Sequence, residues 1–68
     1  MSKEQKLAFL KALRFEGLKA VRKDGRILVY RAGDLACMVE VKNNGSIELT
    51  SCGAGVRLVK ACLMEALA

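Results

Sequence analysis

Several residue types that carry chemistry in other proteins are missing, since the 68-residue chain has no histidine, no tryptophan and no proline. Without histidine, no imidazole is present to activate a cysteine nucleophile or to serve as a zinc ligand. The three cysteines, Cys37, Cys52 and Cys62, form no CxxC pair, so the ligand spacing of a metal site is absent as well. We therefore expect that the protein is not an enzyme and that it holds neither a metal nor a cofactor.

The cysteines are still informative about burial and compartment. Cys52 precedes an expected helix, where the pKa of a thiol can fall, but no base accompanies it. Cys37 and Cys62 fall on apolar faces, where cysteine behaves as a small hydrophobic residue. An odd number of cysteines and no recognisable secretion signal predict free thiols in a reducing, cytoplasmic compartment.

Long apolar runs and aromatic residues are also scarce. No stretch reaches the roughly 18 apolar residues of a membrane span, and Lys11 interrupts the first apolar run before it could form the core of a secretion signal. We therefore expect no membrane partner. The aromatic residues are Phe9, Phe15 and Tyr30, with Tyr30 the one expected to be exposed, so a surface that stacks nucleic-acid bases is not predicted.

Hydrophobic residues make up 53% of the chain, which indicates a globular protein. Residues 1–68 are expected to form a single small domain with an aliphatic core. A chain of this length buries only about 60% of its unfolded surface. Association into a homodimer is one way to supplement so small a core, and we expect that the chain is not strictly monomeric.

Residues 24–50 organise the expected fold. Three β-rich runs, 27–31, 35–42 and 47–50, are separated by the turn signals Gly33-Asp34 and Asn43-Asn44-Gly45. These runs predict a three-stranded antiparallel meander. If Asp24-Gly25 forms a tight hairpin, residues 18–22 add a fourth strand at the edge; otherwise they form an irregular connection.

One helix is expected on each side of the meander. Ser2 and Gln5 fit a capping box that starts a helix over about 3–16, and Gly17 suits the left-handed residue that ends it. Apolar periodicity predicts a second helix from residue 53 or 54 to the end. The predicted class is α+β, with the order helix, three-stranded or four-stranded antiparallel meander, helix, and with both helices on one face of the sheet.

The pairing register decides which side chains face away from the helices. In the central run, one alternating set is expected to face the core: Leu35, Cys37, Val39 and Val41. A loop of Asn43-Asn44-Gly45, with Gly45 left-handed, pairs Val41 with Ile47 and Val39 with Leu49.

The hairpin expected at Gly33-Asp34 leaves two registers open. A turn with Gly33 first pairs Tyr30 with Cys37 and leaves Ile27 and Val29 beside Met38 on the outer face. A register one residue different leaves Leu28 and Tyr30 there instead. Either register predicts an apolar outer face, and exposed apolar surface of this kind marks interfaces. We take Ile27, Val29 and Met38 as the candidate interface.

Positive charge is concentrated in the first half of the chain. Residues 1–31 contain nine basic and three acidic residues, whereas residues 32–68 contain three and four. Phosphate contacts need cations gathered on one surface. The candidate anion-binding residues are Lys11, Arg14, Lys19, Arg22, Lys23, Arg26 and Arg31.

Two further cations, Arg57 and Lys60, follow the stretch Ser51-Cys52-Gly53-Ala54-Gly55. A glycine-containing turn between a strand and a helix can bind phosphate, but a lone GxG more often marks a plain turn. Glu40 and Glu48 are expected to lie opposite each other on the outer face, as a solvated pair with a lysine neighbour.

The order helix, three-stranded antiparallel meander, helix resembles the topology of the double-stranded RNA-binding domain, which has a similar length. The second helix of that family opens with a lysine-rich run, whereas Val56-Arg57-Leu58-Val59-Lys60 stands here. The histidine-bearing strand loop of the family has no counterpart in a chain without histidine. The resemblance concerns topology alone.

Two hypotheses for function follow. The first is a small non-enzymatic binding module whose N-terminal basic surface engages nucleic acid or a nucleoprotein complex. The second is an accessory inhibitor or adaptor, of the kind that phages and mobile elements encode, which docks on a protein partner through its sheet face.

Overall fold

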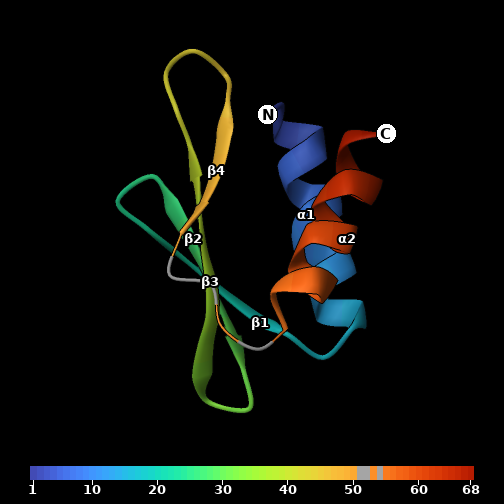
Figure 1. The fold of residues 1–68 in the computed structure, drawn as a ribbon. Coiled ribbons are helices and arrows are strands. Elements are labelled where there is room, and N and C mark those ends of the chain that lie inside the picture. Colours follow the sequence, from blue (N-terminus) through green and yellow to red (C-terminus); the bar gives the residue numbers. More distant parts are fainter. Residues whose placement is uncertain (51–52, 54) are drawn as a thin grey trace.

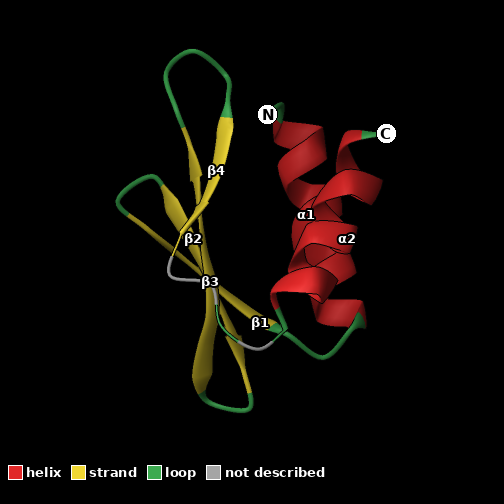
Figure 2. Ribbon diagram, viewed as in Figure 1, coloured by secondary structure: helices red, strands yellow, loops and turns green. Residues whose placement is uncertain are grey.

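The computed structural model describes residues 1–50, 53 and 55–68. Its elements follow the order helix, four antiparallel strands in a meander, helix (Figures 1 and 2). They are α1 (Lys3–Phe15), β1 (Lys19–Lys23), β2 (Arg26–Arg31), β3 (Asp34–Val41), β4 (Ile47–Thr50) and α2 (Val56–Leu67). The predicted α+β class is confirmed, and the segment that could have been an irregular connection is strand β1, so the sheet has four strands.

The molecule has two layers. Figure 1 shows α1 and α2 packed side by side on one side of the sheet, running in opposite directions. In the described part of the chain, the other side of the sheet carries no helix (Figure 2). Among the described residues, no helix is long and apolar enough to cross a membrane.

Both ends of α1 form as the sequence predicts. The Gln5 amide donates to the Ser2 hydroxyl oxygen at 3.0 Å, and the Ser2 amide donates to the Gln5 side-chain oxygen at 2.8 Å, which completes the capping box. At the other end, Gly17 has φ 77°. The Leu18 amide donates to the Leu13 carbonyl at 2.9 Å and the Gly17 amide to the Arg14 carbonyl at 3.0 Å, the bond pattern of a Schellman motif.

The β1–β2 hairpin turns on Asp24 and Gly25. Both have positive φ, 50° and 75°, as in the two-residue type I′ loop whose twist matches that of the flanking strands. Lys23 pairs with Arg26 across the turn. The short-range signal in the sequence therefore sets the position of the edge strand.

The register on which the candidate interface depended, with Tyr30 opposite Cys37 in the β2–β3 hairpin, is wrong. Val29, not Tyr30, pairs with Cys37, and Ile27 pairs with Val39. The loop is Ala32-Gly33, both with positive φ, and Ala36 is an extra residue between the Val29–Cys37 and Tyr30–Leu35 pairs. This β-bulge shifts the alternation of inward and outward side chains along β3 by one residue. Ile27 and Val29 therefore face the helices.

The bulge also changes which β3 residues are buried. Leu35, expected in the core, is 39% exposed, whereas Ala36 is 1% exposed. The Ala36 carbonyl accepts a hydrogen bond from the Gly53 amide at 2.8 Å. The bulge is thus tied to the connection that leads into α2.

The β3–β4 hairpin confirms its prediction. Val41 pairs with Ile47 and Val39 with Leu49, and Gly45 has φ 86°. Asn44 supports the loop, since its side-chain oxygen accepts from the Ser46 amide at 2.9 Å. Three residues with local turn chemistry therefore set the register of β4.

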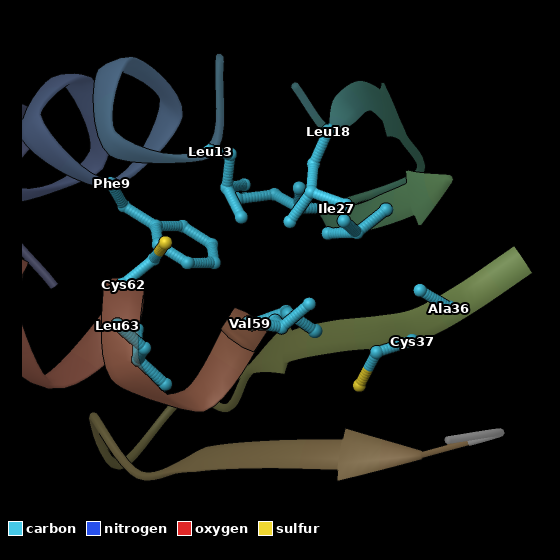
Figure 3. Packing of buried hydrophobic residues seen from close by; sticks show 11 residues of the cluster. Phe9, Leu13, Leu18, Ile27, Ala36, Cys37, Val59, Cys62 and Leu63 are labelled. Carbon is cyan, nitrogen blue, oxygen red and sulfur yellow. The ribbon is translucent and has the colours of Figure 1, made fainter. Parts of the chain in front are cut away.

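The core lies between the two layers and is almost wholly aliphatic. Figure 3 shows Phe9 of α1 and Cys62 of α2 pointing toward each other between the two helices. Burying an apolar side chain of this size stabilises the fold by roughly 1.5–3 kcal/mol before entropy is counted. The largest fully buried side chains are Phe9, Leu13, Val29, Val39, Val59 and Cys37.

Candidate nucleic-acid interface

A basic groove runs between α1 and the strand β1. Three adjoining hollows share Arg22, which lies on the helix side of β1 because its partner Ile27 is buried there. We call this surface the α1–β1 groove. Its basic lining residues are Lys3, Lys6, Arg14, Lys19, Arg22, Lys23 and Arg26.

The groove carries a strong excess of positive charge. Among the described residues that line it, Asp24 is the sole carboxylate. Within the described chain, Arg26 is the one groove cation with an ion pair: its Nε lies 2.9 Å from an Oε of Glu40. The charges of Lys6, Arg14 and Arg22 are therefore available to an anionic ligand.

The geometry of α1 brings its share of these cations onto one side. Lys3, Lys6 and Arg14 are separated by three and eight residues, close to whole turns of a helix. At a rise of about 1.5 Å per residue, Lys3 and Arg14 lie roughly 16 Å apart along the axis. The groove is therefore long enough to meet several phosphates of one strand, which repeat at about 3.4 Å along a duplex axis.

The predicted anion-binding residues are only partly brought together. Arg14, Lys19, Arg22, Lys23 and Arg26 line the groove. Lys11 instead lies in a separate hollow between α1 and α2 with Ala12 and Cys62. Arg57 and Lys60 are exposed on α2 and do not line the described groove.

Lys6 was missed by the sequence analysis, and Lys3 was not selected as a candidate. The signal was the spacing of Lys3, Lys6, Leu10 and Arg14, which places them along one side of a helix. That spacing indicates a site only together with β1 (Lys19–Lys23), because Arg22 of this strand lines the same hollows.

The outer face of the sheet is apolar, as predicted, but with different residues. Ile27 and Val29 are 6% and 0% exposed in the core, so they cannot form the expected surface. Leu28 pairs with Met38 on the outer face, which is the alternative that the sequence left open. The apolar side chains on this face are Val21, Leu28, Tyr30, Leu35 and Met38.

Charged side chains flank this apolar surface. Glu40 and Glu48 lie opposite each other in the β3–β4 pair, as expected. Arg26 pairs with Glu40, and Lys42 pairs with Glu48. The hydrogen bond and charge of Glu48 raise the pKa of Lys42 above its ordinary value. These are solvated ion pairs rather than a pair of catalytic carboxylates.

The described cysteines show no sign of reactivity. Cys37 and Cys62 are both buried. Burial, aided by the charges of Glu16 and Glu65, raises the pKa of the Cys62 thiol and so disfavours the thiolate. No cluster of metal-ligating side chains occurs among the described residues. Cys52 lies outside them.

The strand-to-helix turn before α2 is only partly described, since Ser51, Cys52 and Ala54 lie outside the described residues. Gly55 precedes α2 with φ 91° and makes no side-chain capping bond. A Cβ atom at Gly55 would lie 3.3 Å from Cδ of Arg31, so this glycine permits the Arg31 side chain to pass close to the backbone. The left-handed conformation and the close approach of Arg31 explain why the turn has a glycine at position 55.

One exposed aromatic residue was not expected. Phe15, at the end of α1, is 88% exposed, whereas Tyr30 is half-buried on the outer face of the sheet. Phe15 lies in the hollow that also contains Lys11 and Glu65. No aromatic residue lines the described α1–β1 groove.

Comparisons of the chain with protein-family models, with curated proteins and with solved structures found no match. The four strands also separate it from the three-stranded order of the double-stranded RNA-binding domain that the sequence resembled. Its function has to be inferred from its own surfaces.

Proposed function

We propose that the protein is a non-enzymatic module that binds the sugar–phosphate backbone of nucleic acid in the α1–β1 groove. The observation that carries this proposal is Arg22, which is common to three adjoining hollows that Lys6 and Arg14 also line. Cations without ion-pair partners on one concave surface suit the regular negative charge of phosphates.

The groove favours backbone contacts over base contacts. Lysine and arginine side chains bind phosphates without reading sequence. The apolar residues beside them are aliphatic, such as Leu7 and Leu10, and offer no ring for base stacking. We therefore expect binding that depends on charge and strand geometry and varies little with base sequence.

The test measures binding of a fluorescently labelled DNA duplex, and an RNA duplex of the same sequence, across a salt series. We expect the logarithm of the binding constant to fall linearly with the logarithm of salt concentration. The triple variant Lys6→Gln, Arg14→Gln, Arg22→Gln should flatten this slope by up to about 2.7, at roughly 0.9 for each phosphate contact on duplex DNA.

The chain provides a matched control. The variant Lys11→Gln, Arg57→Gln, Lys60→Gln removes the same charge from exposed positions outside the groove, so its slope should stay close to that of the parent. Exposed substitutions usually change stability by less than about 0.5 kcal/mol, so both variants should fold. Circular dichroism of each variant checks this expectation. An equal loss in the two variants would mean that net charge rather than the groove governs binding, which would contradict the proposal.

A further inference from the structure

The outer face of the sheet carries two rows of side chains that cross all four strands. Partners in the register share a face. Val21 pairs with Leu28, Leu28 with Met38, and Met38 with Thr50, which makes a row of three apolar side chains and one threonine. A second row, which is charged, lies two residues away from the first along each strand. Its members, in the order β1 to β4, are Lys23, Arg26, Glu40 and Glu48.

The order of charges in the second row is the informative feature. It runs positive, positive, negative, negative across the sheet, from Lys23 on one edge strand to Glu48 on the other. A row with this order is complementary to its own reverse. When the strand order of a second copy is reversed, the first row also fits its counterpart, since Leu28 of one copy then lies over Met38 of the other.

We propose that the outer face is a homodimer interface in which two copies pack face to face about a two-fold axis parallel to the strands. This axis places β1 of one copy over β4 of its partner and keeps each row at the same height. Lys23 then lies over Glu48 of the partner subunit, and Leu28 packs on Met38 of the partner subunit. A two-fold interface of this kind uses the same patch on both copies.

The charges also exclude the other face-to-face arrangement. A two-fold axis perpendicular to the strands would place β1 over β1 of the partner. The outer side chains of β1 include Lys19 and Lys23, so positive charge would meet positive charge. Within the described chain, Lys23 has no ion pair, and the proposed arrangement supplies one.

The size of the face sets the strength of the dimer. Four strands at about 4.8 Å spacing make a face roughly 20 Å wide, and strands of this length at about 3.3 Å per residue make it roughly 20 Å long, so a pair of such faces buries on the order of 800 Å². Stable interfaces begin at about 1,200 Å². The dimer is therefore expected at high micromolar rather than nanomolar protein concentration, and it should weaken with salt because its charged row is accessible to solvent.

The experiment exchanges charges between the two edge strands. Lys23→Glu alone sets the new carboxylate over Glu48 of the partner subunit, and Glu48→Lys alone sets the new ammonium group over Lys23 of the partner subunit. Sedimentation velocity from low micromolar to millimolar concentration should show each variant monomeric where the parent is dimeric. An equimolar mixture of the two variants should restore the dimer, because both contacts in the mixed pair join opposite charges.

Restoration of the dimer in the mixture would have to come from contacts between two chains, because neither variant carries both charge changes. The matched controls Lys60→Glu and Glu65→Lys make the same charge changes on exposed positions of α2, and each should dimerise as the parent does. Met38→Glu should abolish the dimer with the helical circular-dichroism signal unchanged. A parent chain that stays monomeric at millimolar concentration, or a mixture that stays monomeric when the parent does not, overturns the proposal; the first result would leave the face to a different protein partner.

Discussion

At the scale of single residues, burial changes the chemistry of Cys62. Its thiol is 4% exposed, and burial is the first cause of its raised pKa, ahead of Glu16 and Glu65. A group whose pKa is higher in the folded state contributes stability that is present below its unfolded pKa and is lost as pH rises. For a thiol, the unfolded pKa is about 8.5.

We therefore expect the unfolding free energy of the parent to fall, as pH rises above the unfolded thiol pKa of about 8.5, by a component that Cys62→Ala lacks, since the unfolded chain releases the Cys62 proton first. One proton accounts for at most about 1.4 kcal/mol per pH unit. Urea unfolding of both proteins at several pH values measures the difference. Lys42, whose pKa is also raised, is present in both proteins, so its contribution cancels. Parallel pH profiles would contradict the assigned cause.

At the scale of elements, Ala36 is the extra residue of the bulge in β3, so the strand can lose it without turning any other side chain to the opposite face. Deleting Ala36 leaves the partners on both sides of it, Tyr30–Leu35 and Val29–Cys37, in a regular hairpin with unchanged faces. We expect this deletion to fold and to cost about 1–2 kcal/mol, through the lost bond from Gly53 and a small packing defect. Thermal or urea unfolding measures the change.

Deleting Glu40 provides the contrast. It removes one residue between the bulge and the β3–β4 loop, so Ile47 and Leu49 would turn outward and Glu48 inward. This should cost several kcal/mol, a large share of the roughly 5–15 kcal/mol that stabilises most domains. If the two deletions destabilised the protein equally, Ala36 would not be the extra residue of the strand.

The elements also show how far the sequence predicted the fold. The capping box at Ser2, the left-handed Gly17 and the Asn43-Asn44-Gly45 loop were predictable, because each depends on residues adjacent in the chain. The bulge at Ala36 was not, because its hydrogen bond comes from Gly53, far along the sequence. For the same reason Lys6 escaped notice: its neighbour Arg22 belongs to a strand that the sequence left uncertain.

At the scale of the whole molecule, the centres of the two proposed surfaces lie on opposite sides of the sheet, and Lys19, Lys23 and Arg26 border both. Arg22 faces the helices and Val21 faces outward, because neighbouring residues in a strand alternate. The two kinds of binding should therefore be separable.

We expect the variant Lys6→Gln, Arg14→Gln, Arg22→Gln to dimerise like the parent. We also expect Met38→Glu to bind nucleic acid as a monomer with an unaltered salt slope. Sedimentation velocity and fluorescence anisotropy on the same preparations test both expectations. If either variant lost both properties while remaining folded, one continuous surface would serve both partners.

The meander bears on the order in which the protein assembles. Every strand pairs with its neighbour in sequence, so the sheet needs only short loops to close, which cost little entropy and favour fast folding. The contact between α1 and α2 joins the two ends of the chain and closes the longest loop (Figure 1). During synthesis the meander is complete before α2 emerges, and until then the core lacks Val59, Cys62 and Leu63. The helix made after the sheet thus completes the core, and a chain that stops before α2 would leave part of the sheet's apolar face uncovered.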